Sequence, residues 1–283
     1  MKPRARDLNI RIGQLQPGPL NAITDVPGVR VGHSNVRGRS DSGRDICTGV
    51  TVIEPRRGST NQQPCFAGVH VLNGNGDATG LEWIREAGLL TSPIAFTNTH
   101  SLGVVRDALI ALDRQQQPDD GRLYWNMPVV LETFDGLLND INGFHVKPEH
   151  VAEALNSAHD GAVEEGAVGG GSGMICHEFK GGIGSASRRL SSAQGGWTVG
   201  AIVQANHGIR SELRVDGYPV GRYMEQVDSP FLRASLPHPG MGSIVVCLAT
   251  DAPLLPHQCT RLAQRASLGL ARSGGGNEDH SGD

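Results

Sequence analysis

The sequence predicts a mixed α/β or α+β fold, in which strands and helices interleave in layers. Short apolar runs bounded by Gly, Pro or Asn are typical of buried strands. Longer stretches between them carry apolar residues at helical spacing. The two kinds of segment do not keep the strict alternation of a doubly wound parallel protein. Glycine is also abundant, with 39 residues among 283, which indicates many tight turns and close backbone approaches.

Runs rich in Val and Ile mark the predicted strands. Within residues 20–33 the break at Pro27 and Gly28 separates a turn from a first short strand. The longest signal covers residues 197–205, and turn residues starting at Asn206 end it. The other strands are predicted, in chain order, at residues 49–53, 68–72, 93–97, 128–131 and 243–250.

Helices are predicted where apolar residues recur every three or four positions. Thr99 or Ser101 is a candidate N-cap for a helix that turns Val105 and Leu109 inward. Pro148 is a typical first residue for the next helix. No internal repeat and no convincing linker is evident, so we expect one domain over residues 1–283. The helices are predicted near residues 78–88, from 101 past 112, at 148–165 and at 253–272.

Charge and apolar content exclude several classes of protein. A net charge of −4 offers no basic surface for nucleic acid. The chain has no apolar run of about 18 residues, the length that a membrane-spanning helix needs. The charged N-terminus is not followed by the apolar segment of a secretory signal. We therefore expect a cytoplasmic protein with neither a nucleic acid nor a membrane as its partner.

The cysteines and histidines give no pattern for a metal site. The five cysteines are odd in number and widely spaced, and neither a C-x-x-C pair nor an H-E-x-x-H motif occurs. The eleven histidines are scattered without a ligand spacing. We expect no metal, no cofactor and no disulfide framework.

A small hydroxyl residue, Ser243, stands where a Gly-rich approach meets an apolar strand. The residue before Ser243 is Gly242. Because glycine has no side chain, the peptide bond between Gly242 and Ser243 is sterically open. Cleavage at that bond would free an α-amino group with an ordinary pKa of about 8 beside the hydroxyl, so one residue would hold both nucleophile and base. The alternative is a plain turn before a strand.

Polar residues at the ends of two other strands are candidates for the same chemistry. Glu132 could act as a general acid or base or hold a substrate ammonium, and its alternative is a solvated strand end. Asn206 could donate its amide N–H to an oxyanion, and its alternative is turn chemistry. The glycine loop 169–173 could cradle a phosphate, although the lysine of a P-loop is absent.

Several segments together resemble the DmpA family of self-processing peptidases, which includes L-aminopeptidase/D-amidase-esterases and β-peptidyl aminopeptidases. The resemblance extends over nearly the whole chain. The segments that carry it are residues 21–33, 73–76, 132–140, 169–184 and 249–254.

The resemblance implies a four-layer αββα sandwich of the DmpA and ornithine acetyltransferase type, cut before a serine that becomes the nucleophile. That residue corresponds to Ser243, and the cut falls after Gly242. The resemblance likewise implies that Asn206 lines the oxyanion hole and that Glu132 binds the free amino group of a peptide, amide or ester substrate. The resemblance also implies that Ser281 is a second serine that assists catalysis near the nucleophile.

Two residues and the length of the chain depart from the family pattern. Phe134 stands where the amidase-type members have Tyr, and Asp283 stands where the family has Glu. Family members continue beyond this point, so residues 1–242 correspond to the α-subunit and 243–283 to the start of the β-subunit. Family members also form homo-oligomers, commonly tetramers of processed units. The alternatives are an inactive truncated paralogue that acts as a binding or assembly subunit, and an acetyltransferase of the ornithine acetyltransferase type.

Overall fold

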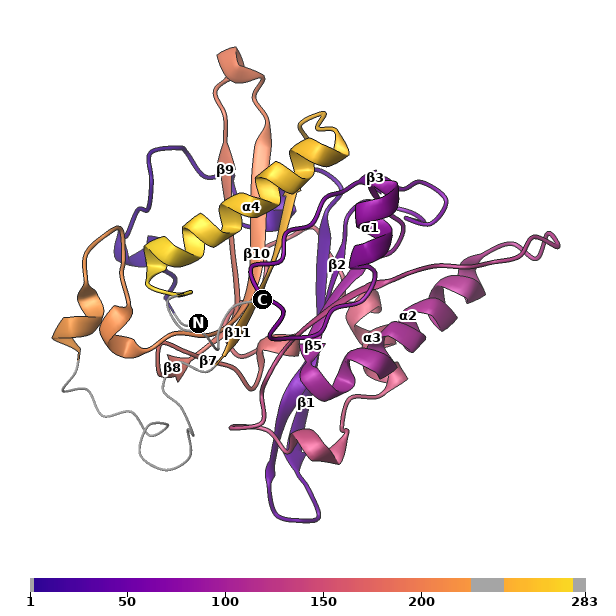
Figure 1. Cartoon of the computed structure of the whole chain (residues 1–283), viewed down its shortest axis with the longest axis horizontal. Coiled ribbons are helices and arrows are strands. Elements are labelled where there is room, and N and C mark those ends of the chain that lie inside the picture. The colour runs from indigo at the N-terminus through magenta and orange to yellow at the C-terminus, as the bar shows by residue number, and fades with distance from the viewer. Residues whose placement is uncertain (1–2, 225–241, 277–283) are drawn as a thin grey trace.

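The computed structural model describes residues 3–224 and 242–276, and two β-sheets form its centre (Figure 1). The first sheet has the strand order β1-β2-β5-β6. Its strands β1, β2 and β5 pair antiparallel, whereas β6 lies parallel to β5. Their bounds are β1 Arg30–Arg39, β2 Asp45–Glu54, β5 Ile94–Asn98 and β6 Val129–Thr133.

The second sheet is antiparallel and has the strand order β11-β10-β9. In its register Asn206, the last residue of β10, pairs with Ser243, the first residue of β11. Two candidate residues that are far apart in the sequence therefore become neighbours across one strand pair. The bounds are β9 Gly182–Arg189, β10 Thr198–Asn206 and β11 Ser243–Thr250.

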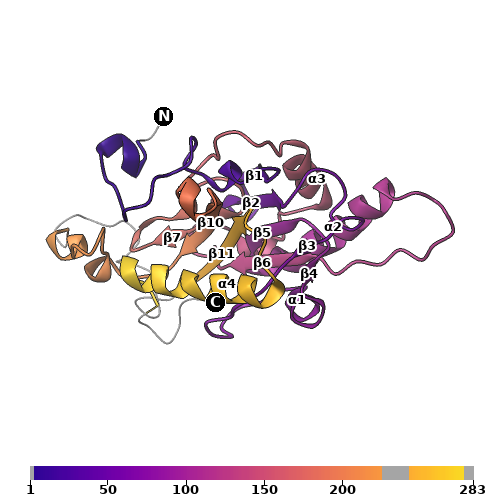
Figure 2. The ribbon, with the colours of Figure 1, turned by 90° about the horizontal axis from the view of Figure 1, so that it is seen from above.

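Helices cover the outer faces of both sheets. Helices α2 (Leu102–Gln116) and α3 (Pro148–Asn156) pack against the first sheet, and α4 (Pro256–Ser273) packs against β11 of the second. Figure 2 shows α2 and α3 on one side of the strands and α4 on the other. This order of layers confirms the predicted αββα sandwich.

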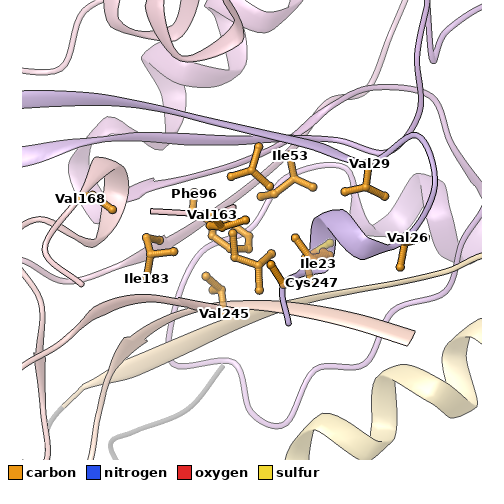
Figure 3. Packing of buried hydrophobic residues seen from close by; sticks show 13 residues of the cluster. Ile23, Val26, Val29, Ile53, Phe96, Val163, Val168, Ile183, Val245 and Cys247 are labelled. Carbon is orange, nitrogen blue, oxygen red and sulfur yellow. The ribbon is translucent and has the colours of Figure 1, made fainter. Parts of the chain in front are cut away.

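The principal core lies between the two sheets (Figure 3). The first sheet contributes Ile53 and Phe96, and the second contributes Ile202, Val245 and Cys247. Alternate residues of a strand point to opposite faces, so each sheet turns one apolar set toward the other sheet and another toward its helices. A second cluster, which includes residues of β2, α2 and α3, fills the space between the first sheet and its helices.

Phe96 is fully buried at the centre of this core. We expect Phe96→Ala to lower the free energy of unfolding by about 3–5 kcal/mol, because the substitution removes buried apolar surface and leaves a cavity. Phe66→Ala is the matched control, since the Phe66 side chain is 58% exposed, and it should change stability by less than about 1 kcal/mol. Urea denaturation of the purified variants measures both, and equal losses would contradict this account of the core.

Most predicted elements are confirmed, although some boundaries and two strands differ. The predicted strand at residues 68–72 is wrong, since that segment has no regular secondary structure. The helix that starts at Pro148 ends at Asn156 rather than near residue 165. Strand β9 was not predicted, because its sequence, GIGSASRR, mixes small and polar residues without an apolar run.

The remaining regular elements are short. Helix α1 packs beside β4 at the edge of the first sheet, where Ile84 is buried with Leu90 and Val129. The bounds are α1 Leu81–Ala87, β3 Cys65–Phe66, β4 Leu89–Leu90, β7 Ile175–Cys176 and β8 Phe179–Lys180. Among residues 3–224 and 242–276, none of the helices has the length and apolar character needed to cross a membrane.

Candidate active site

Ser243 begins β11 with a buried side chain. The residue is 5% exposed, and its Oγ has no hydrogen-bond partner among the described residues. An unpaired buried hydroxyl costs free energy, because water could have solvated it. A structural serine would normally have a hydrogen-bond partner. An unpaired buried hydroxyl is more typical of a serine that faces a substrate or a reacting carbonyl group.

Gly242 passes unusually close to the strand that bears Asn206. A Cβ added to Gly242 would lie 1.9 Å from the backbone oxygen of Asn206 and 2.9 Å from Cα of His207. Both atoms belong to the backbone and cannot move aside cheaply. Glycine at this position is therefore required by packing, and the close approach holds the Gly242–Ser243 bond against the end of β10.

Both ends of the Asn206 amide are held by backbone partners. Its Oδ1 accepts a hydrogen bond from the N–H of Ile175 at 2.8 Å, and its Nδ2 donates to the carbonyl of Phe134 at 2.8 Å. An amide nitrogen carries two N–H groups, so one remains after the bond to Phe134. The side chain is thus oriented beside Ser243 with a donor to spare for a developing oxyanion.

Glu132 lies near the end of β6 and is only 3% exposed. Its Oε1 accepts from the backbone N–H of Asp77 at 2.9 Å, and the hydroxyl of Thr99 donates to its Oε2. The alternative of a solvated strand end is therefore wrong. A buried carboxylate held by neutral donors has no cationic partner in these contacts, which suits it to receive an ammonium group.

The fold connects these candidates through the segment after β6. Phe134, two residues beyond Glu132, supplies the carbonyl that Asn206 contacts, while its ring is 42% exposed. The amide of Gln204 donates to Thr133 Oγ1 at 2.8 Å and ties the two sheets together at the same place. The sequence-predicted residues Glu132, Asn206 and Ser243 thus belong to one connected region. Ser281 and Asp283 lie outside the described residues.

A second buried carboxyl, Asp135, shapes the loop that follows Glu132. Burial raises the pKa of Asp135 to about 6, and its Oδ1 accepts from Asn139 Nδ2 at 3.0 Å. The Asn139 Oδ1 in turn accepts from the backbone N–H of Cys47. Sequence reasoning named Glu132 and Phe134 in this segment but not Asp135, whose burial follows only from the packing of the loop against β2.

The glycine loop has a packing role. Gly169, Gly170 and Gly171 are buried, and a Cβ on Gly170 would lie 2.3 Å from Gln204 Oε1 and 2.5 Å from the carbonyl of Phe96. The loop is enclosed between the sheets, which leaves no room for a phosphate. The phosphate interpretation is therefore wrong.

A cavity of about 730 Å³ lies next to the candidate residues. Its lining includes Asp77, which donates a hydrogen bond to Glu132, and Leu131, which precedes Glu132 in the sequence. It also includes Ile244, the residue after Ser243. Most of the remaining lining is apolar and comes from the segment 65–72, β11 and α4.

One further cluster was not found from the sequence. The ligand-type atoms of Cys176, His177 and His207 all lie within 4.8 Å of one another. No short spacing motif connects residue 207 to the other two, and the hairpin formed by β7 and β8 brings them together. The absence of a metal remains a prediction from the sequence.

Comparison with known proteins places these residues in a family. The model of peptidase family S58 matches residues 21–283. The β-peptidyl aminopeptidase BapA of Sphingosinicella microcystinivorans is 46% identical, with 99% of this chain and 73% of that protein covered. BapA of Sphingosinicella xenopeptidilytica is 42% identical over 96% of this chain and 70% of that protein.

Solved structures agree with the sequence relatives. A β-aminopeptidase of a Burkholderia species has a TM-score of 0.92 and 67% identity, and the match covers 99% of this chain and 75% of that one. The L-aminopeptidase D-Ala-esterase/amidase of Ochrobactrum anthropi, described as a prototype of the serine aminopeptidases and a variant of the Ntn hydrolase fold, has a TM-score of 0.89. It is 44% identical over 100% of this chain and 77% of that protein.

Proposed function

The chain belongs to peptidase family S58, and we propose that it cuts itself between Gly242 and Ser243 and then acts as an N-terminal-serine aminopeptidase. The observation that carries this proposal is the pairing of Asn206 with Ser243 in the register of β10 and β11. It sets an oriented amide donor beside a buried hydroxyl that has no partner among the described residues.

Self-cleavage starts from the hydroxyl of Ser243. Its Oγ attacks the carbonyl carbon of Gly242, and the hydroxyl proton passes to the nitrogen of the breaking peptide bond, so an ester replaces the amide. Water then hydrolyses the ester. The products are a carboxylate on Gly242 and a Ser243 residue with a free hydroxyl and a free α-amino group. The tight passage of Gly242 against Asn206 supports this step by restricting the bond to one position.

Turnover uses the same hydroxyl with a new base. The freed α-amino group, with an ordinary pKa of about 8, accepts the Ser243 proton as Oγ attacks the substrate carbonyl. Asn206 Nδ2 stabilises the negative charge on the carbonyl oxygen. The α-ammonium returns its proton to the leaving amine, and water releases the acyl group from Ser243. Every proton in this scheme is carried by the chain itself or by water.

Glu132 gives the reaction its requirement for a free amino end. Its carboxylate is buried and held by Asp77 and Thr99, so it pairs with the substrate ammonium in a region of low dielectric constant. Substrates without that ammonium leave the carboxylate buried and unpaired. This preference distinguishes an aminopeptidase from an enzyme that cuts inside a chain.

We expect Glu132→Gln to lower kcat/KM for amino-acid p-nitroanilides by about 10- to 100-fold, mainly through KM, because a charge-assisted hydrogen bond becomes a neutral one. The exposed Glu149 in the first turn of α3 provides the matched control, Glu149→Gln, which should leave kcat/KM unchanged. N-acetylated substrates should be poor for all three proteins. Equal activity of wild type and Glu132→Gln would remove Glu132 from substrate recognition.

The names of the relatives support a proposal for the substrate class. Proteins named as β-aminopeptidases share 67% and 46% identity with this chain, and we propose that it accepts peptides and amides with an N-terminal β-amino acid. Comparing β-alanyl with L- and D-alanyl p-nitroanilides tests this class. If only the L- or D-alanyl substrates were hydrolysed, the protein would instead be an aminopeptidase for α-amino acids.

The processed protein consists of residues 1–242 and a second piece that starts at Ser243, in one αββα domain that assembles as a homo-oligomer of processed units. The pairing of β10 with β11 supports the retention of both pieces after the cut, since that strand pair joins them. Light scattering after size-exclusion chromatography measures the number of units, with a tetramer as the expected result.

A further inference from the structure

The hairpin of β7 and β8 has a strained turn that points toward the end of β10. Its two turn residues, His177 and Glu178, both have positive φ angles, 48° and 62°. Such angles suit Asn and Gly and cost other residues about 1–2 kcal/mol each. Neighbouring groups hold the turn in place, since the N–H of His177 donates to the carbonyl of His207 at 2.8 Å and Arg210 donates to the carbonyl of Glu178 at 3.3 Å.

This turn assembles three side chains that commonly bind metal ions. The Cys176 Sγ lies 3.7 Å from Nε2 of His207, and the rings of His177 and His207 meet edge to face with 5.1 Å between their centroids. A tetrahedral zinc ion, with bonds of about 2.3 Å to sulfur and about 2.0 Å to nitrogen, separates such a sulfur and nitrogen by about 3.5 Å. The observed Cys176–His207 spacing is close to that value.

The hydrogen bonds of His177 leave its second nitrogen available to a metal. Its Nδ1 lies 3.0 Å from the carbonyl of Ile209, to which only a protonated nitrogen can donate. Nδ1 therefore carries a proton, and in the neutral ring the lone pair lies on Nε2. Zinc-bound histidines are typically oriented by this kind of bond to a carbonyl.

We propose that Cys176, His177 and His207 form a site for one divalent cation of the zinc class, beside the active site and outside its chemistry. Cys176 contributes a thiolate, each histidine contributes a neutral ring nitrogen, and water completes the coordination. Binding transfers one proton from the Cys176 thiol to solvent for each cation taken up. The cation therefore competes with that proton for the sulfur.

The site would fix the orientation of Asn206. The residue before Cys176, Ile175, donates its N–H to Asn206 Oδ1 at 2.8 Å, and His207 directly follows Asn206. A cation bound to Cys176, His177 and His207 would fasten the hairpin to the end of β10 on both sides of that hydrogen bond. The cation thereby stabilises the amide that faces Ser243 and does not touch the substrate.

The test uses the purified full chain, stripped with a chelator and titrated with Co²⁺, whose thiolate complexes absorb in the near ultraviolet. Wild type should bind one Co²⁺ per chain with a thiolate-to-metal band, Zn²⁺ should displace it, and Zn²⁺ should raise the melting temperature. Cys176→Ser should lose the band and bind at least about tenfold more weakly. Cys259→Ser is the matched control, because Cys259 is a half-buried free cysteine on α4, and it should retain both.

His177→Gln provides a second variant if Cys176→Ser folds poorly, as judged by circular dichroism, and it should weaken Co²⁺ binding at least about tenfold. Failure of the wild-type chain to bind Co²⁺ or Zn²⁺ stoichiometrically would overturn the proposal whatever the variants do. Retention of the band in Cys176→Ser would overturn it as well. Peptidase activity does not enter these readouts, so the proposed function and the cation site can fail independently.

Discussion

The Ser243→Ala chain is expected to remain a single uncut species of 30.0 kDa, whereas wild type separates into two pieces at the Gly242–Ser243 bond. The alanine removes the only atom that can attack the Gly242 carbonyl in the proposed scheme. Hydrolysis of amino-acid p-nitroanilides should fall by at least about 10,000-fold, because nucleophile and base are lost together. Denaturing gel electrophoresis with intact mass measures the cut, and release of p-nitroaniline measures activity.

Two variants separate chemistry from folding in this experiment. Ser243→Cys retains a nucleophile of similar size and should be cut, although more slowly. Ser192→Ala changes an exposed serine in the turn before β10 and should behave as wild type. Cleavage of Ser243→Ala at the same bond would refute self-processing by this residue. If the wild-type chain were cleaved only after addition of an unrelated protease, self-processing would be refuted altogether.

Loss of the Asn206 amide has the second-largest expected effect, a fall in kcat of about 100- to 1000-fold, or about 3 kcal/mol of transition-state stabilisation. Asn206→Asp retains an oxygen that can accept from the N–H of Ile175 but has no N–H to donate. Asn206→Ala removes both groups. Both variants should lose kcat with little change in KM, since the oxyanion exists only in the transition state.

The role of Asn206 in packing calls for a stability measurement beside the kinetics. Its two hydrogen bonds to Ile175 and Phe134 are partly buried, so Asn206→Ala should also lower the melting temperature. A fall in kcat that appears in Asn206→Ala but not in Asn206→Asp would assign the residue to structure alone. Equal losses in both variants support a donor to the oxyanion.

Local sequence predicted the elements whose signal is itself local. The apolar runs of β5, β6, β10 and β11 and the spacing in α2 were sufficient, because buried strands and helix faces impose their period on neighbouring residues. Strand β9 was not predicted, because its pairing with β10, rather than its own composition, makes it a strand. The segment 68–72 carries a strand-like pattern but has no partner strand in the described structure.

The candidate site divides in the same way. The family motifs named Glu132, Asn206 and Ser243 from the sequence, and the residue types alone left each with an ordinary alternative. The burial of Glu132 and the pairing of Asn206 with Ser243 depend on contacts between residues tens of positions apart. No local pattern encodes such contacts, since they follow from how the two sheets are registered.

The sequence by itself determined the layered α/β class, the family and the serine at the start of β11. Tertiary structure decided which polar groups meet. It set Asn206 beside Ser243, buried Glu132 beneath Asp77 and Thr99, and gathered Cys176, His177 and His207 at one turn. The physical reason is that element formation depends on short-range periodicity, whereas strand register and the packing of sheets bring distant residues within bonding distance.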